Sequence, residues 1–138
     1  GKFIAEQTVK QLASRGMQTA GARLLVLGIT FKENCSDLRN SRVLDLVREL
    51  IEYGCTVAVH DPIADSRDAA AEYGIKLEAL ADIGKSQAVV LAVPHKHYSA
   101  MSCTDFQGLL NPDGLLIDVK GVIDRDEADK AGLELWRV

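Results

Sequence analysis

The hydrophobic residues of this chain fall into continuous apolar runs and into stretches where apolar residues recur every three to four positions. Continuous runs are typical of buried strands, whereas the second spacing is typical of one face of a helix. The runs predict strands over residues 24–30, 55–62, 75–78, 87–95, 114–121 and 133–138. The periodic stretches predict an opening helix and helices over residues 41–53, 64–73, 79–85, 97–110 and 124–132.

The predicted strands and helices alternate along the chain, which implies a parallel sheet with helices on both faces. The predicted fold class is α/β, a Rossmann-like doubly wound parallel sheet of five or six strands, preceded by an appended helix. We assign residues 1–20 to that helix and a linker, and residues 21–138 to the sheet domain. Ligands of such sheets bind at the carboxyl ends of the strands. In this chain those ends are residues 30–40, 60–63, 94–98 and 119–122.

The connection over residues 30–40, TFKENCSDLRN, is unusually long. Connections between a strand and a helix usually take roughly 2–6 residues. The G-x-G-x-x-G pattern of a dinucleotide-binding turn is absent, because Gly28 stands alone and is followed by Phe31 and Lys32. We therefore do not expect this turn to bind NAD by itself.

The same connection and the start of the next helix hold three basic residues, Lys32, Arg39 and Arg42. Lysine binds phosphate as a point charge and arginine as a fork, and the free N–H groups at a helix start add to this. The loop therefore favours a phosphorylated ligand. The alternative is that Lys32 with Glu33, and Asp37 with Arg39, form solvated ion pairs of little consequence. The residue types alone leave both interpretations open.

Histidine and aspartate residues lie near two other predicted strand ends. Asp61 precedes Pro62, and this pair favours a turn in which the carboxylate accepts nearby N–H groups over contact with a ribose. His95 and His97, with His60 elsewhere, lack the nearby carboxylate or cysteine cluster of a metal site. No metal is expected.

Lys120 and Cys35 are the remaining candidates for chemistry. Lys120 ends a predicted core strand, where it either contacts an anion or is an ordinary surface lysine, and both interpretations stay open. Cys35 lies among basic residues, a setting found around reactive thiols. No general base is near it in the sequence, so Cys35 is predicted not to be a nucleophile.

Length and composition narrow the class of protein. A chain of 138 residues suffices for one domain with its own core, and its net charge of −4 argues against a nucleic-acid binder. No apolar run approaches the roughly 20 residues that span a bilayer, so no membrane partner is expected. Three separated cysteines without C-x-x-C spacing favour reduced thiols and a cytoplasmic location. The chain opens at Gly1 inside a helical pattern with no N-cap, so we expect a piece of a longer protein.

The segment GITFKENCSDLRNSR, residues 28–42, resembles the C-terminal, UDP-binding domain of the UDP-glucose/GDP-mannose dehydrogenase family. The shared features are a strand that ends in glycine, the Phe-Lys pair and the Asp-x-Arg-x-Ser spacing. Three later segments are similar to the same family: VHDP, AVPHKHY and LLIDVKGV, residues 59–62, 92–98 and 115–122. The loop and the AVPHKHY segment further resemble the branch that acts on UDP-N-acetyl-hexosamines in bacterial polysaccharide biosynthesis.

The resemblance implies part of an NAD-dependent oxidoreductase that oxidises C6 of a UDP-sugar, UDP-N-acetyl-hexosamine or UDP-glucose, to a uronic acid in two steps. In that family an N-terminal Rossmann domain holds NAD, and a central domain supplies the catalytic Cys and a Lys. Neither domain is in this chain, so we assign it no catalytic residue and expect it to be inactive alone. Its implied partners are the UDP-sugar, the other two domains of a parent chain, and further copies in a homodimer or larger assembly.

The resemblance also implies roles for individual residues. Phe31 would pack near the nucleotide sugar, and Lys32 would supply charge or a hydrogen bond near the reacting sugar. Lys120 lies where the family has a further basic substrate contact. Arg39 would reach across a cleft to the NAD on the N-terminal domain, and Asp37 would orient Arg39 or brace the loop.

Two rival functions remain for comparison. A non-catalytic nucleotide-sensing Rossmann-like module would lack a G-x-G-x-x-G unit and a catalytic Cys upstream in its parent chain. A phosphoacceptor signalling domain of the flavodoxin-like class requires clustered acids after the first strand. The first predicted strand here ends in Gly-Ile-Thr, which disfavours that class.

Overall fold

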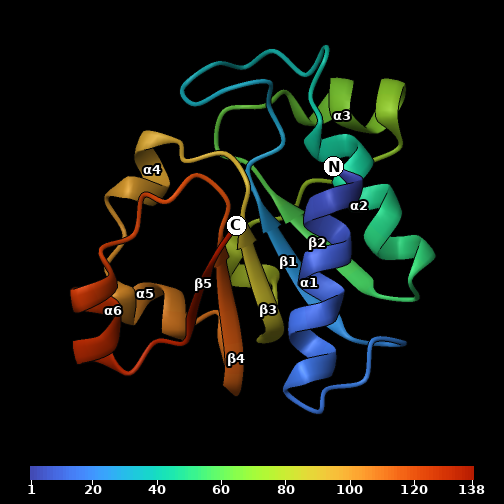
Figure 1. Ribbon diagram of the computed structural model, residues 1–138. Coiled ribbons are helices and arrows are strands. Elements are labelled where there is room, and N and C mark those ends of the chain that lie inside the picture. The colour runs from blue at the N-terminus through green and yellow to red at the C-terminus, as the bar shows by residue number, and fades with distance from the viewer.

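Five parallel strands form the centre of the structure, a computed structural model that describes residues 1–138 (Figure 1). The strands are β1 (Arg23–Leu27), β2 (Thr56–His60), β3 (Ser86–Leu91), β4 (Leu110–Asp118) and β5 (Leu135–Arg137). The helices are α1 (Lys2–Ser14), α2 (Val43–Glu52), α3 (Ser66–Tyr73), α4 (Lys96–Ser99), α5 (Cys103–Gln107) and α6 (Arg125–Ala131), with a 3₁₀ turn, η1 (Leu80–Asp82). None of these helices combines the length and the hydrophobicity that a membrane span requires.

The sheet has the order β2-β1-β3-β4-β5, and every neighbouring pair is parallel. The predicted doubly wound α/β sheet is therefore confirmed, with five strands. Val26 of β1 lies between Val59 of β2 and Val90 of β3 in register. Because the chain leaves β1 toward β2 and later returns to the other side of β1 as β3, the boundary between β1 and β3 is the topological switch point.

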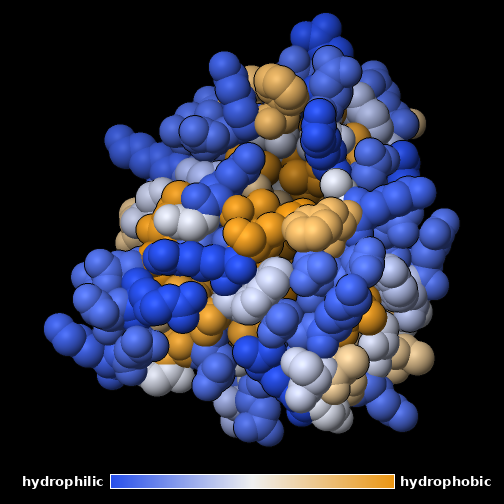
Figure 2. Space-filling model, in the orientation of Figure 1, coloured by the Kyte–Doolittle hydropathy of each residue, from blue (hydrophilic) through white to orange (hydrophobic).

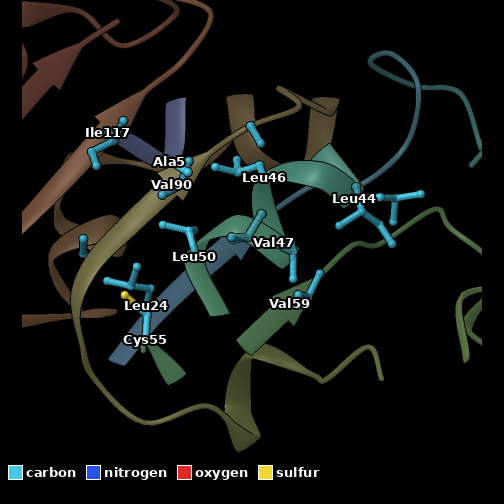
Figure 3. Close-up of a cluster of buried hydrophobic side chains, with 14 of the residues drawn as sticks. Ala5, Leu24, Leu44, Leu46, Val47, Leu50, Cys55, Val59, Val90 and Ile117 are labelled. Carbon is cyan, nitrogen blue, oxygen red and sulfur yellow. The ribbon is translucent and has the colours of Figure 1, made fainter. Parts of the chain in front are cut away.

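Alternate residues of the central strands enter two separate hydrophobic clusters, one on each face. Leu24 and Val26 of β1 pack with α1 and α2, as the close-up in Figure 3 shows for Leu24 beside Leu50 of α2. Leu25 and Leu27 pack on the other face with α4, α5 and α6. Burying each such leucine contributes about 1.5–3 kcal/mol, which explains why strands covered on both faces are continuously apolar.

Helix α1 packs beside α2 on one face of the sheet (Figure 1). Its residues Ala5, Thr8 and Leu12 are buried at helical spacing, and the Thr8 hydroxyl donates to the Ile4 carbonyl at 2.7 Å. The helix therefore shares the core of the sheet domain. The division of the chain at residue 20 stays a prediction.

Three predicted elements take a different form in the structure, the first being the helix predicted over residues 79–85, which is only the 3₁₀ turn η1. The segment 75–78 is not a strand, since only Leu77 forms a bridge, to Val59. The predicted helix over 97–110 is two short helices, α4 and α5. The second begins anew because the Ser102 hydroxyl accepts the N–H of Asp105 while the Asp105 carboxylate accepts the N–H of Ser102.

Candidate nucleotide-binding pocket

A pocket of about 530 Å³ opens at the carboxyl ends of β1, β3 and β4. The residues that follow these strands line it: Thr30, Phe31, Lys32 and Glu33 after β1, Ala92 and Val93 after β3, and Val119 and Lys120 after β4. The pocket therefore lies at the switch point of the sheet, where ligands of open α/β sheets bind. Of the four predicted strand ends, residues 30–40 and 119–122 contribute to it, whereas 60–63 and 94–98 do not.

One wall of the pocket is apolar and comes from helices. Phe3 and Ile4 of α1, and Val43 and Leu46 of α2, line this wall. Figure 2 shows apolar side chains gathered in the middle of this face and framed by hydrophilic ones. Phe3 and Phe31 are 60% and 55% exposed, which is unusual for residues of this size and indicates a binding surface.

The rim of the pocket is cationic. Lys32, Arg42 and Lys120 line it together with a single acid, Glu33. All three basic residues are exposed, and none forms an ion pair with any carboxylate of the chain. The alternative in which Lys32 is paired with Glu33 is therefore not observed. A chain of net charge −4 thus places three uncompensated cations around one pocket, an arrangement that suits an anionic ligand.

Arg39 and Asp37 lie outside the lining of this pocket and form a pair with each other. The Arg39 guanidinium donates to the two Asp37 oxygens at 3.0 and 3.1 Å, and the Arg39 N–H donates to Asp37 Oδ1 at 2.8 Å. The hydrogen bonds from the Arg39 side chain, and to a smaller extent the bond from the Arg39 backbone N–H, lower the pKa of Asp37. The same side-chain pairing raises the pKa of Arg39. Because the Arg39 side chain is 81% exposed, this pair adds little stability but restricts where the guanidinium lies.

The loop between β1 and α2 is closed by hydrogen bonds at its base. The Phe31 N–H donates to the Asp37 carbonyl at 2.7 Å, and the buried Ser41 hydroxyl donates to the Ile29 carbonyl at 2.6 Å. Leu38 is buried between these points. Helix α2 begins at Val43, and the N-cap position, Arg42, makes no side-chain cap bond, although the Val43 N–H donates to Ser41 Oγ at 3.3 Å.

Asp61 follows β2 and makes the predicted turn. Its Oδ1 accepts the N–H groups of Ile63 and Ala64 at 2.8 and 2.9 Å. Its Oδ2 accepts the Ile29 N–H at 2.8 Å and lies 2.9 Å from Nε2 of His95. Burial raises the pKa of the carboxyl, but the three backbone donors and the His95 contact together hold it below its ordinary value. Asp61 is thus occupied within the fold, away from the pocket.

The histidines are engaged by protein groups. The Tyr98 hydroxyl donates to the His60 carbonyl at 2.9 Å and lies 2.8 Å from His60 Nδ1. Burial lowers the pKa of His60 and raises that of Tyr98. His97 is exposed beside the His60 ring, with centroids 5.9 Å apart. No group of three or more His, Cys, Asp or Glu side chains is placed to hold a metal ion.

The predicted site residues therefore divide into two groups. Phe31, Lys32 and Lys120 meet at one pocket, whereas Arg39 and Asp37 form a separate pair on the outside of the loop. Sequence reasoning missed the helical wall around Phe3, because the opening helix was treated only as an appendage. The apolar spacing of that helix indicates which of its faces is buried. Phe3 is a large apolar residue outside that buried face, and this position was the signal that could have predicted the wall.

Comparison with known proteins gives a consistent result. The family model for the UDP binding domain of the UDP-glucose/GDP-mannose dehydrogenase family matches residues 25–125. Protein CapL of Staphylococcus aureus is 39% identical over 137 residues, which is 99% of this chain and 32% of that protein. A UDP-N-acetyl-D-glucosamine 6-dehydrogenase of Pseudomonas aeruginosa is 40% identical over 129 residues, 94% of this chain and 31% of that protein. The chain thus spans about a third of the length of the curated relatives it matches.

Solved structures show the same fold. The NDP-N-acetyl-D-galactosaminuronic acid dehydrogenase from Methanosarcina mazei Go1 superposes with a TM-score of 0.83 at 22% identity, over 99% of this chain and 29% of that one. A UDP-glucose dehydrogenase from Pyrobaculum islandicum superposes with a TM-score of 0.65 at 25% identity, over 91% of this chain and 28% of that one. The five-stranded domain is therefore a unit that also occurs within longer chains.

Proposed function

Since this chain belongs to the UDP-glucose/GDP-mannose dehydrogenase family and matches its UDP binding domain, we propose that the pocket at the switch point binds the nucleotide part of a UDP-sugar. The observation that carries the proposal is the meeting of Lys32, Arg42 and Lys120, all without an acidic partner, around one pocket. The diphosphate is the anionic part of such a ligand, and these cations are its natural contacts.

The apolar wall gives the same pocket a second property. The exposed rings of Phe3 and Phe31 offer surfaces against which a planar base packs, while the cations lie on the rim. The volume of about 530 Å³ lies within the range of roughly 300–1,000 Å³ usual for small-molecule sites. Combined apolar and cationic contacts favour a nucleotide over a simple inorganic anion.

We propose further that the parent protein oxidises C6 of the bound sugar to a carboxylate with NAD as the hydride acceptor. Two curated relatives carry the name UDP-N-acetyl-D-glucosamine 6-dehydrogenase, which supports this class of substrate. Lys32 would lie near the sugar, and Arg39, held by Asp37, would extend toward the cofactor. The chain has no G-x-G-x-x-G turn after β1, so NAD would be held mainly by another domain, and this chain alone would not turn over. The three free cysteines suit a cytoplasmic location.

A titration of UDP into the 138-residue chain, followed by NMR of its backbone amides, tests the binding proposal. Each exposed cation–phosphate contact contributes about 1 kcal/mol in water, so three such contacts with modest packing predict a Kd of order 1 mM. NAD should produce no comparable shifts. Lys32→Ala and Lys120→Ala should each weaken UDP binding about fivefold, whereas Lys76→Ala, an exposed lysine outside the pocket, should leave it unchanged.

The same titration can refute the binding proposal, whereas the parent chain separates a dehydrogenase from a nucleotide-sensing module. If millimolar UDP shifts no amide around the pocket, or if Lys76→Ala weakens binding as much as Lys32→Ala does, the pocket is not a nucleotide site. A nucleotide-sensing module would also bind UDP. It differs in its parent chain, which would carry no G-x-G-x-x-G unit and no catalytic Cys.

A further inference from the structure

One buried histidine is placed directly behind the ligand-facing loop without entering the pocket. His95 follows β3, and its side chain is fully buried. Its Nε2 lies 2.9 Å from Asp61 Oδ2 and 3.2 Å from Thr30 Oγ1, and its Nδ1 accepts the Asn34 N–H at 2.9 Å. Three segments far apart in the sequence thus meet on one imidazole ring.

The hydrogen-bond partners determine where the ring carries its proton. A backbone N–H only donates, so Nδ1 must accept and carries no proton. Nε2 therefore carries the hydrogen and directs it toward the Asp61 carboxylate and the Thr30 oxygen. The Thr30 hydroxyl is consistent with this, because it donates its own hydrogen to the Lys32 carbonyl at 2.9 Å and leaves its lone pairs for the ring.

The consequence is that the backbone directly after Lys32 is held on both sides of Glu33. On one side the Thr30 hydroxyl binds the carbonyl of Lys32, and on the other the ring binds the N–H of Asn34. Asn34 is further held by its Oδ1, which accepts the Lys96 N–H at 2.8 Å. Its φ of 59° is in the left-handed region, where asparagine is tolerated better than most residues. Lys32 itself is exposed, so its position is set by the loop backbone, and these bonds act together with the bond from the Phe31 N–H to the Asp37 carbonyl on its other side.

We propose that His95 is a positioning residue for Lys32 and that its Nδ1 bond to the Asn34 N–H maintains the affinity of the pocket for the ligand's diphosphate. Asp61 would act one step further back, by fixing the ring in the form that leaves Nδ1 free to accept. The inference rests on the proposed UDP site. It goes beyond it, because neither His95 nor Asp61 lines the pocket.

Two substitutions of His95 separate positioning from mere support of the fold. His95→Asn places an amide oxygen near the position of Nδ1, so it can still accept the Asn34 N–H, but it is too short to reach Asp61. His95→Gln is long enough to place its NH₂ group near Asp61, but it offers no acceptor at the position of Nδ1. We expect His95→Asn to melt at the lower temperature yet bind UDP within about twofold of wild type. His95→Gln should melt higher but bind about five- to tenfold more weakly.

Thr30→Val gives a second measurement, because it removes the hydroxyl that binds the Lys32 carbonyl but keeps the Asp61 contact of His95. It should weaken UDP binding about threefold to fivefold, and because the hydroxyl is buried it should also lower the melting temperature. Thr56→Val is the matched control, since Thr56 is exposed at the opposite, amino end of the sheet. The imidazole nitrogens of His95, observed by NMR, should show a proton on Nε2 only.

The outcomes are distinguishable. If the wild-type chain does not bind UDP at all, the proposed function fails and this inference fails with it. If the wild type binds UDP but affinity follows melting temperature, so that His95→Gln binds more tightly than His95→Asn, then His95 only supports the fold. A proton on Nδ1, or a Thr30→Val variant that binds like Thr56→Val, would equally overturn the positioning role.

Discussion

Replacing Asp61 by asparagine alters a carboxylate that four protein donors contact. Oδ1 accepts from Ile63 and Ala64 at 2.8 and 2.9 Å, while Oδ2 accepts from Ile29 at 2.8 Å and lies 2.9 Å from His95 Nε2. An asparagine side chain keeps one oxygen, so its NH₂ group faces two donors whichever way it is oriented. Every orientation therefore takes the side-chain acceptor at position 61 from two N–H groups, although His95 keeps its 3.2 Å contact with Thr30 Oγ1 when the NH₂ group replaces Oδ2.

The cost of Asp61→Asn follows from these contacts. A buried donor without an acceptor costs about 1–3 kcal/mol, so two of them should lower the free energy of unfolding by about 2–6 kcal/mol. For a chain of this length, the melting temperature should fall by roughly 6–24 °C. Asp65→Asn is the matched control, because Asp65 caps α3 by accepting the N–H groups of Arg67 and Asp68. Asparagine and aspartate cap helices about equally, so this variant should stay within about 0.5 kcal/mol of wild type.

Urea unfolding of both variants across a pH series completes the test. Burial raises the pKa of the Asp61 carboxyl, but the hydrogen bonds that it accepts lower that pKa by more. Its folded-state pKa therefore lies below the ordinary value. The stabilisation is therefore fully present above the unfolded-state pKa of about 3.9 and is lost as the pH falls through the folded-state pKa. The difference in free energy of unfolding between wild type and Asp61→Asn should become smaller only in that acidic range. The reasoning would be refuted if, at neutral pH, Asp61→Asn lowered the free energy of unfolding no more than Asp65→Asn does. It would also be refuted if the difference between wild type and Asp61→Asn stayed constant in acid.

Three further results are expected. Leu50→Ala, at a fully buried position of α2, should cost about 2–5 kcal/mol in urea unfolding, whereas Ile51→Ala, 54% exposed, should cost under about 0.5 kcal/mol. Gly28→Ala should destabilise more than Gly121→Ala, because φ is positive at both but only at Gly28 does an added Cβ meet another residue, 2.6 Å from Val93 Cβ; equal melting temperatures would contradict this. UDP affinity should fall steeply as salt approaches about 1 M, where the Debye length is about 3 Å, and a salt-independent Kd would show that the cations on the rim are not the contacts.

The sheet was predictable because its strands are buried on both faces, but the ends of its elements were not. The run at residues 24–30 reads as one strand, yet pairing stops at Leu27. The reason is local: Gly28 has a φ of 86° and its N–H donates to the His60 carbonyl, while Ile29 bonds to Asp61. These buried residues look like strand in the sequence because they are apolar, although their N–H groups bond to the last residue of β2 and to the Asp61 side chain just after it.

The meeting of Phe31, Lys32 and Lys120 at one pocket followed from a general rule, since the carboxyl ends of parallel strands share one edge of the sheet. The contacts behind the loop followed from no rule of spacing. Asn34 and His95 are 61 residues apart, and nothing near either of them in the sequence predicts the other. A donor and an acceptor brought together by tertiary structure alone leave no periodic signal, which is why His95 was considered only as a possible metal ligand.

The length of the loop between β1 and α2 can now be explained by the two directions in which its side chains point. Three side chains of the loop point inward. The Asn34 side chain accepts the Lys96 N–H, Leu38 is buried in the core, and the Ser41 hydroxyl donates to the Ile29 carbonyl. Lys32 and Arg39 are exposed. A compact glycine turn fixes its backbone by its own geometry and presents N–H groups to a phosphate. A loop that presents side chains instead needs other residues to hold its backbone, and those residues account for the additional length.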